Sequence, residues 1–189
     1  MAIPKKLPET LTPLECKALL AQPKPRYPTG LRDLCMLRLM LNTGLRASEC
    51  LNLKVRDIDW LSGKLMVREG KGKKDRTLWI NEDVLELLRK WRQRRPVESE
   101  LLFTTLEGNR VNDRALRAMV ERRAEKAGIP KNVHPHMLRH TFATEIYRQT
   151  KDIRGVQKML GHADLSTTML YTHLVDADVE NAMRWFNIG

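Results

Sequence analysis

One apolar segment constrains the fold of this chain more than any other part of its sequence. Residues 31–42 read LRDLCMLRLMLN, which is too long and too apolar for a typical strand and indicates a buried helix that ends near Gly44. With 189 residues, of which 42% are hydrophobic, the chain is large enough to bury such a helix in one ordinary domain. We therefore expect a packed globular protein rather than a disordered one.

The rest of the chain alternates helical and strand-like patterns with glycine and proline breaks. Thr12, Pro13 and Glu15 are typical of a helix start, whereas the three prolines within residues 22–30 predict a loop. The other predicted helices span 47–53, 82–94, 111–127, 135–148, 153–160, 165–171 (a short helix or turn) and 176–186. The predicted strands, joined as a meander, span 55–60, 64–68 and 76–80. The expected fold class is mainly α with a small three-stranded antiparallel β-sheet (α+β).

Charge and cysteine content narrow the class of function. The formal net charge of +11 favours a polyanionic partner, with nucleic acid ahead of an anionic membrane surface. Cys16, Cys35 and Cys50 have no CxxC spacing, so neither a disulfide framework nor a zinc site is predicted. The sequence has no apolar signal-peptide core and no run of roughly 18 apolar residues that could span a membrane. We expect a cytoplasmic protein without a membrane partner.

Two charged motifs lie at predicted breaks in the first half of the chain. In TGLRASE (43–49), Arg46 offers a planar fork of donors suited to phosphate oxygens, and Glu49 could hold it, although an exposed charged pair is the simpler interpretation. The segment GKGKKDR (70–76) is a basic hairpin turn that could approach DNA closely, or could simply be a solvated turn. It does not match a Walker A loop, because it joins two strands.

Two histidines and an arginine share one face of the helix predicted from Pro135. His136, Arg139 and His140 are spaced i, i+3 and i+4, and together they could stabilise charge on a phosphate. The same spacing occurs in HExxH zinc sites, but Met137 occupies the position of the general-base glutamate, so a metal site is not predicted.

Two further candidates, His162 and Tyr171, follow near the C-terminus. His162 comes directly after a helix-ending glycine and could donate a hydrogen bond to an anion. A tyrosine hydroxyl such as that of Tyr171 can attack phosphorus, but its reference pKa of about 10 means that neighbouring cations must assist. Taken alone, His162 is more simply interpreted as a residue at a helix end, and Tyr171 as a packing residue.

Taken together, these motifs resemble the tyrosine recombinase (phage integrase) family, especially its Xer-like bacterial members. The matching segments, TGLRASE, EGKGKKDR, HPHMLRHTFAT and LGHADLSTTMLYTH, occur in the family's order and span residues 43–173. The resemblance implies the catalytic-domain fold of DNA breaking-rejoining enzymes. It also implies domain limits, with residues 1–10 as a linker or arm and 11–189 as the catalytic domain. The sequence departs from the family in one respect: typical members carry an N-terminal core-binding domain, which we expect to be absent here.

The resemblance implies a role for each matching residue at a scissile phosphate. Arg46 and Arg139 clamp the phosphate, His136 contacts it, His162 hydrogen-bonds a non-bridging oxygen, and Glu49 supports the pocket. Tyr171 is the nucleophile, and Lys71 is the general acid for the leaving 5′ oxygen. The remaining predicted DNA contacts are made by Lys73, Lys74, Arg76 and His140.

The activity implied is site-specific DNA recombination or integration through a 3′-phosphotyrosyl intermediate, without a metal, a cofactor or ATP. The implied partner is double-stranded DNA, on which full-length family members form homo-oligomers; for the isolated domain, a monomer is the alternative. The implied source is a bacterium, a phage or a mobile element. Two alternatives stay open: a DNA-binding module whose pocket is idle without a core-binding domain, and a type IB topoisomerase-like activity.

Overall fold

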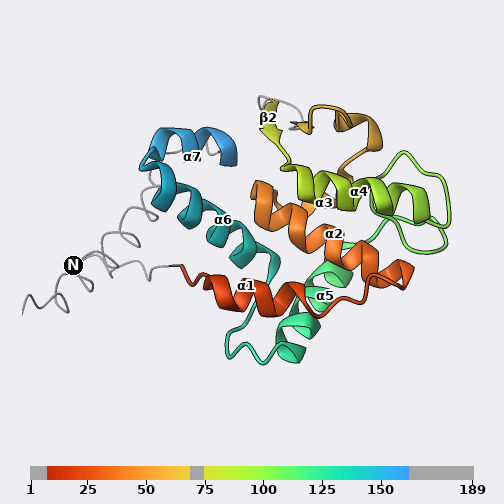
Figure 1. Ribbon diagram of the computed structural model, residues 1–189, viewed down its shortest axis with the longest axis horizontal. Helices are drawn as coiled ribbons and strands as arrows, with labels where there is room; N and C mark the ends of the chain where they lie inside the picture. The colour runs from red at the N-terminus through yellow and green to blue at the C-terminus, as the bar shows by residue number, and fades with distance from the viewer. Residues whose placement is uncertain (1–7, 69–74, 162–189) are drawn as a thin grey trace, which may run out of the picture.

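The computed structural model describes residues 8–68 and 75–161 of the chain, and it confirms a mainly helical fold with a small antiparallel sheet (Figure 1). The predicted segments 165–171 and 176–186 and the tip of the basic hairpin lie outside the described residues. The described elements are α1 (Pro13–Leu20), α2 (Pro28–Thr43), α3 (Ala47–Asn52), the 3-10 turn η1 (Val55–Asp57), β1 (Lys64–Val67), β2 (Arg76–Trp79), α4 (Glu82–Arg94), α5 (Asp113–Lys126), α6 (Pro135–Thr150) and α7 (Ile153–Leu160).

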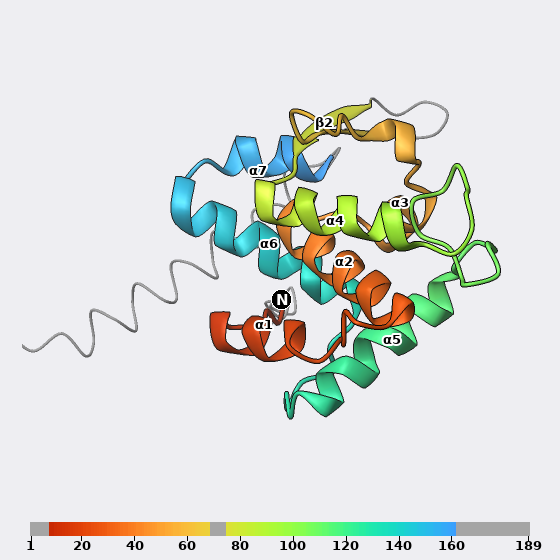
Figure 2. The ribbon, with the colours of Figure 1, turned by 45° about the vertical axis from the view of Figure 1, so that its right-hand side comes forward.

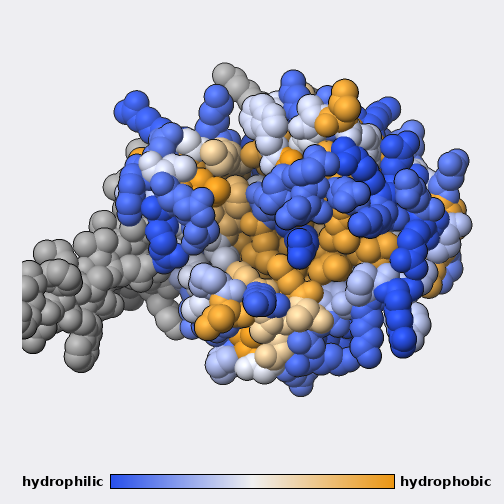
Figure 3. All heavy atoms as spheres, in the orientation of Figure 1, coloured by the Kyte–Doolittle hydropathy of each residue, from blue (hydrophilic) through white to orange (hydrophobic). Residues whose placement is uncertain are grey.

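Helix α2 is the centre of the domain, as its apolar sequence predicts. It packs against α4 and against α6, and Figures 1 and 2 both show it between these helices. It begins at Pro28 rather than after Gly30. Proline suits the first helical position, because an N–H at that position would have no hydrogen-bond partner within the helix and proline has none to lose. In the space-filling view, hydrophilic side chains cover most of the visible face and hydrophobic ones gather near its centre (Figure 3). No described helix is long and apolar enough to cross a membrane.

Gly44 ends α2 in a conformation that other residues adopt at a cost. Its φ of 64° is left-handed, and its N–H donates to the Met40 carbonyl over 2.9 Å. An added Cβ would overlap the ring of Phe142 on α6. Glycine is therefore needed here both for the backbone turn and for the close contact between α2 and α6.

The first predicted strand is wrong. Residues 55–60 form the turn η1 followed by a single bridge between Ile58 and Leu65, so the described sheet has two strands. The cause is local: the Asp57 carboxylate accepts the Lys54 N–H over 2.9 Å, and the Trp60 indole N–H donates to the Val55 carbonyl over 3.0 Å. These bonds close a tight turn in a segment whose alternating apolar residues resemble a strand.

The β1–β2 ladder fixes which side chains of β2 face inward. The pairing runs from Lys64 opposite Trp79 to Val67 opposite Arg76. Because side chains alternate along a strand, Arg76 and Leu78 are buried whereas Trp79 is exposed. Arg76 therefore points toward the protein interior at the end of the strand.

Helix α7 is joined to α6 by an apolar cluster separate from the main core. The cluster consists of Phe142 and Ala143 on α6 with Val156 and Leu160 on α7. Asp152 caps the start of α7 by accepting the Gly155 N–H over 2.9 Å, and Gly161 ends it with a φ of 62°. This packing brings the C-terminal end of α7 beside β2.

We predict that Gly44→Ala lowers the free energy of unfolding by about 2–5 kcal/mol, because backbone strain adds to displacement of the Phe142 ring. Gly128→Ala is the matched control: its φ is 67°, but an added Cβ meets nothing within 4 Å. It should cost only the backbone term of about 1–2 kcal/mol. Urea denaturation of both variants measures the difference, and equal losses would contradict the role given to Phe142.

Candidate active site

Three arginines from different elements meet the C-terminal end of α7. Arg76 Nε donates to the Met159 carbonyl over 2.8 Å, Arg139 Nη2 to the Leu160 carbonyl over 2.7 Å, and Arg46 Nη2 to the Gly161 carbonyl over 3.2 Å. The last carbonyls of a helix lack partners within the helix and carry the negative end of its dipole. Helix α7 thus offers three consecutive acceptors that hold the guanidinium groups together.

Arg139 links two helix ends. Besides the Leu160 carbonyl, its guanidinium donates to the carbonyl of Gly44 at the end of α2 over 2.7 Å. The residue is 1% exposed, so its charge is buried among these backbone dipoles. Gly44 belongs to the TGLRASE motif and Gly161 to the LGH motif, and both residues turn left-handed. These turns leave the helix-end carbonyls free to accept hydrogen bonds from the arginines.

Glu49 is the carboxylate of the cluster, and hydrogen bonds occupy both of its oxygens. Its Oε1 accepts from Arg46 Nη1 over 2.7 Å and from Arg76 Nη1 over 3.0 Å. Its Oε2 accepts from the Arg46 backbone N–H over 2.8 Å and from Arg76 Nη2 over 2.7 Å. The RASE spacing makes this possible, because Glu49 is the third residue of α3 and reaches back to Arg46 at its N-cap.

The arginines of the described cluster differ in how accessible they are. The side chains of Arg76 and Glu49 are 7% and 10% exposed, whereas that of Arg46 is 33% exposed. Within residues 8–68 and 75–161, three guanidinium groups and the Glu49 carboxylate meet here, and guanidinium groups attract anions. Such an arrangement suits a phosphate group, which arginine contacts through paired hydrogen bonds.

The environment of Glu49 keeps it ionised. Burial by itself would raise its pKa, but hydrogen bonds from Arg76 and from the Arg46 backbone N–H, with the charge of Arg76, lower the pKa from 4.5 to about 2. The carboxylate therefore remains charged at neutral pH.

His136 stands beside the cluster in an edge-to-face contact with His140. The two ring centroids are 4.3 Å apart and the rings are inclined by 77°. His136 is exposed, but partial loss of water, followed by the positive charge of Arg139 and then those of His134 and Arg46, lowers its pKa. At neutral pH its ring is therefore mainly neutral until an anion binds nearby.

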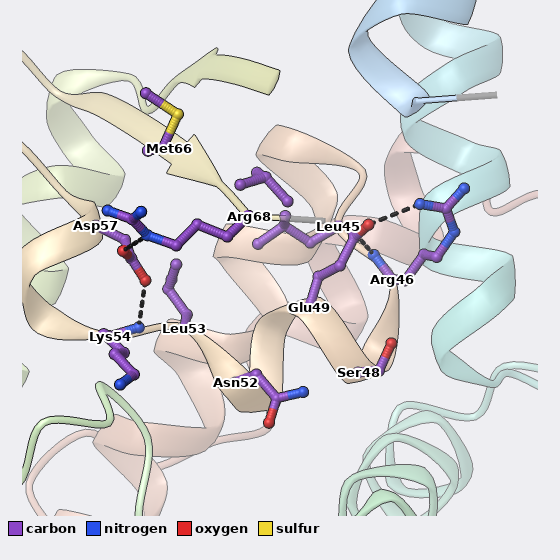
Figure 4. A pocket seen from close by; sticks show the side chains of 11 residues that line it. Leu45, Arg46, Ser48, Glu49, Asn52, Leu53, Lys54, Asp57, Met66 and Arg68 are labelled. Carbon is purple, nitrogen blue, oxygen red and sulfur yellow. Dashed lines mark hydrogen bonds and ion pairs between the residues drawn. The ribbon is translucent and has the colours of Figure 1, made fainter. Parts of the chain in front are cut away.

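A cleft of about 380 Å³ opens next to the cluster, between α3, η1 and β1. Figure 4 shows Arg46 and Glu49 at one end of it and the Arg68–Asp57 pair, whose Nε and Oδ1 are 2.8 Å apart, toward the other. Within residues 8–68 and 75–161, no three His, Cys, Asp or Glu side chains are grouped so that they could hold a metal ion.

The structure brings together five of the residues singled out from the sequence and places a sixth, Arg76, where it was not expected. Arg46, Glu49, Arg139, His136 and His140 lie in one region. Arg76, which was expected on the DNA-facing hairpin, instead has its guanidinium buried against Glu49 and α7. The strand period is the signal that could have shown this, since Arg76, Leu78 and Ile80 alternate inward. The residues outside the described part of the chain are Lys71, Lys73, Lys74, His162 and Tyr171.

Residues 9–178 match the model of the phage integrase family. The chain belongs to the phage integrase family. It is 40% identical over 172 residues to tyrosine recombinase XerC of Xanthomonas axonopodis pv. citri (strain 306), a match that covers 90% of this chain and 56% of that protein. It is 36% identical over 189 residues to XerD of Staphylococcus aureus (strain Mu50 / ATCC 700699), which covers 97% of this chain and 64% of that protein. This member of the family thus spans somewhat more than half the length of these relatives.

Solved structures of integrase-family proteins share the fold. XerA recombinase superposes with a TM-score of 0.83 at 33% identity, covering 97% of this chain and 68% of that one. XerH bound to its palindromic difH substrate in a post-cleavage complex superposes with a TM-score of 0.81 at 33% identity. The match covers 95% of this chain and 54% of that one. The catalytic domain of bacteriophage HP1 integrase superposes with a TM-score of 0.67 at 26% identity, and the match covers 96% of both chains.

We predict that Glu49→Gln lowers the free energy of unfolding at neutral pH by on the order of 3 kcal/mol, because buried Arg76 and partly exposed Arg46 lose their shared anion. A carboxylate whose pKa is lower in the folded state stabilises the protein above its unfolded pKa. The advantage of the wild type should thus be complete above about pH 4.5 and disappear as the pH falls toward about 2.

Urea denaturation at several pH values measures this advantage. Glu100→Gln is the control, because Glu100 pairs with Lys54 on the surface with 71% of its side chain exposed, and its loss should change stability little. A difference between wild type and Glu49→Gln that stays constant down to about pH 2 would argue against the ion pair as its source.

Proposed function

We propose that residues 11–189 form the catalytic domain of a site-specific DNA recombinase, which cuts and rejoins double-stranded DNA through a covalent link to Tyr171, and that residues 1–10 are a linker or arm. The observation that carries the proposal is the convergence of Arg46, Glu49 and Arg139 at the end of α7, with His136 beside them. Family membership and the printed names of the recombinase relatives support it.

The arginine cluster stabilises the charge that develops on the scissile phosphate. Arg46 presents its partly exposed guanidinium to the non-bridging oxygens, and buried Arg139 supplies a positive charge that does not have to reorganise during the reaction. His136, and His162 after Gly161, add donors. Lys73, Lys74 and His140 extend the contact with the DNA backbone, whose phosphates supply most of the affinity.

The reaction proceeds by two balanced transesterifications. The Tyr171 hydroxyl gives its proton to neutral His136 as its oxygen attacks phosphorus, the bond from phosphorus to the 5′ oxygen breaks, and Lys71 donates a proton to form the 5′-hydroxyl. The resulting 3′-phosphotyrosyl ester retains the phosphodiester bond energy. A 5′-hydroxyl of another strand then gives its proton to Lys71 and attacks the ester, and His136 returns a proton to the departing Tyr171 oxygen. Neither ATP nor a metal or other cofactor takes part in these steps.

The proposed partners follow from this chemistry. Double-stranded DNA is the substrate, and XerH, at 33% identity, is described in complex with its difH substrate. Recombination of two sites requires several subunits on DNA, so we propose a homo-oligomer on DNA. The bacterial relatives support a bacterial, phage or mobile-element source and a cytoplasmic site of action.

We predict that the chain forms a covalent complex with DNA and that Tyr171→Phe forms none. Nicked duplexes with randomised sequence are incubated with each protein in EDTA, quenched with SDS and run on a denaturing gel. A slow, protease-sensitive band in the wild type alone establishes the nucleophile and metal independence, and sequencing of the trapped DNA gives the preferred site. DNA binding on a native gel without any covalent band would instead favour a DNA-binding module with an idle pocket.

We also predict that DNA binding strengthens as the pH falls below about 6.5, the ordinary pKa of histidine. The pKa of His136 is lowered in the unbound protein, and a bound phosphate would raise it, so binding takes up a proton in this range. Fluorescence anisotropy at constant ionic strength measures the affinity. His136→Gln should show a flatter pH dependence, and identical curves for the two proteins would assign the effect to other groups.

A further inference from the structure

We propose that Lys24, Arg26 and Arg94 form a second DNA-binding surface, which holds backbone phosphates of the duplex that flanks the reacting phosphate. We call these three residues the basic patch. The proposal rests on the proposed function, in which DNA is the substrate, and it adds a contact that lies away from the arginine cluster. Its ligand is the phosphodiester backbone, whatever the base sequence.

The basic patch lies at the opposite end of α2 from the arginine cluster. Lys24 and Arg26 precede the start of α2 at Pro28, whereas the carbonyl of Gly44 at its C-terminal end accepts a hydrogen bond from Arg139. Helix α2 has 16 residues, so a rise of about 1.5 Å per residue separates its ends by about 24 Å. Figures 1 and 2 both show the start of α2 beside the end of α4, with α7 at the far side of the domain. The reacting phosphate therefore cannot contact both sites.

Uncharged partners hold the arginines of the basic patch in place. The Arg94 guanidinium, at the end of α4, donates to the carbonyls of Pro25 and Arg26 over 3.2 and 2.9 Å. The Arg26 guanidinium lies over the ring of Tyr27, 4.5 Å from its centroid, and donates to the Tyr27 hydroxyl. These contacts order the side chains without cancelling their charges, because carbonyls, a hydroxyl and an aromatic ring carry no net charge.

Other arginines of the protein are neutralised by carboxylates. Arg123, for example, donates to Asp33 over 2.7 Å. Within residues 8–68 and 75–161, by contrast, none of Lys24, Arg26 and Arg94 forms an ion pair with an Asp or Glu side chain, and all three residues are exposed. Exposed cations without acidic partners attract the phosphates of a nucleic acid.

The loop that carries Lys24 and Arg26 is stiff. Residues 22–30 include three prolines, which fix the backbone angle φ. The Tyr27 N–H donates to the Lys24 carbonyl over 3.1 Å and closes a turn. This turn packs tightly on α2, since a Cβ at Gly30 would overlap the Lys24 carbonyl. A surface that is already rigid loses little entropy on binding, so the basic patch is preorganised for a stiff ligand such as a duplex.

The start of α2 adds to the attraction for anions. Tyr27 occupies its N-cap position and gives no side-chain hydrogen bond to the first turn. The first N–H groups of a helix have no partners within the helix, and they form the positive end of its dipole. A phosphate at the basic patch therefore lies near both the side-chain cations and this helix end.

The distance between the two sites selects the occupant. Base pairs follow one another about every 3.4 Å along a duplex, so about 24 Å corresponds to about seven base pairs. Once the arginine cluster has bound a phosphate, the flanking phosphates are tethered close to the basic patch at a high effective concentration. We therefore assign the patch to DNA on the flank of the exchange site.

The test measures the binding of a fluorescent duplex of about 30 base pairs by anisotropy at a series of salt concentrations. The triple variant Lys24→Gln, Arg26→Gln, Arg94→Gln removes three cations. The slope of log affinity against log salt should therefore become shallower by about 2–3, and the affinity at about 0.1 M salt should fall by at least about tenfold.

The matched control removes the same amount of charge from other parts of the surface. Lys17, Arg122 and Lys126 are exposed cations on α1 and α5 that also form no ion pair within the described residues. Replacing all three with Gln should leave the affinity within about threefold of the wild type. Equal losses in the two triple variants would show a general effect of net charge and overturn the proposal.

A further pair of variants separates the charge of the patch from its support of the loop. Arg94→Lys keeps the charge but loses the paired donation to the two carbonyls, so its salt slope should stay close to that of the wild type. The double variant Lys24→Gln, Arg26→Gln keeps the Arg94 side chain, and its slope should become shallower by about 2. The reverse order of effects would mean that the loop matters and its charge does not, and the proposal would be wrong.

Duplex length tests the assignment to flanking DNA. The exchange site found by covalent trapping is shortened to about four base pairs on each side, which ends short of the patch at about seven. On this duplex the triple variant and the matched control should bind alike. A loss that persists in the triple variant alone would place the patch on other DNA and overturn the assignment to the flank.

These outcomes separate from those of the proposed function. The salt measurements require no cleavage, so the expected salt pattern without a covalent DNA complex retains the basic patch and loses the recombinase. At saturating DNA the triple variant should form the covalent complex at the wild-type rate, because the patch does not touch the reacting phosphate. A wild type that forms the covalent complex while both triple variants bind alike retains the recombinase and loses the patch.

Discussion

Three guanidinium groups, two of them buried, meet the end of one short helix, and the rest of the site depends on this arrangement. Buried cations are costly unless acceptors surround them, and the last carbonyls of a helix are costly unless donors reach them. The carbonyls of Met159, Leu160 and Gly161 accept hydrogen bonds from the arginines, so donors and acceptors satisfy one another. The same bonds therefore complete the fold and create the positive pocket, so the site and its support cannot be separated.

The glycines at the two helix ends make this arrangement possible. At Gly44 and Gly161 the chain turns left-handed, which leaves the carbonyls at the ends of α2 and α7 directed at Arg139 and Arg46. Gly44 also lies so close to Phe142 that α2 and α6 could not approach with a side chain there. The short TG and LG elements of the motifs are thus structural requirements for placing arginines, as well as landmarks of the family.

The three arginines have two different tasks under the proposed function: two support the site and one contacts the phosphate. Arg139 and Arg76 are buried and held by backbone carbonyls or by Glu49, whereas Arg46 is partly exposed. Such a division suits catalysis on a phosphate, because a donor that contacts the substrate is most effective when its surroundings do not move. The solved relatives of known fold, among them XerH with its DNA, show that this scaffold serves recombinases.

The sequence by itself determined the elements with local causes. Spacing within a few residues accounts for the apolar run of α2, the cap of α1, the helix-ending glycines, and the helical face shared by His136, Arg139 and His140. The motifs identified the family. The tertiary structure decided what depends on contacts distant in sequence. It turned residues 55–60 into a capped turn with one bridge, and it set Arg76 against Glu49, 27 residues away, and α7, 83 residues away. A charge in a basic run looks exposed until the strand pairing shows which way it points, because burial is a property of the packed chain rather than of the residue.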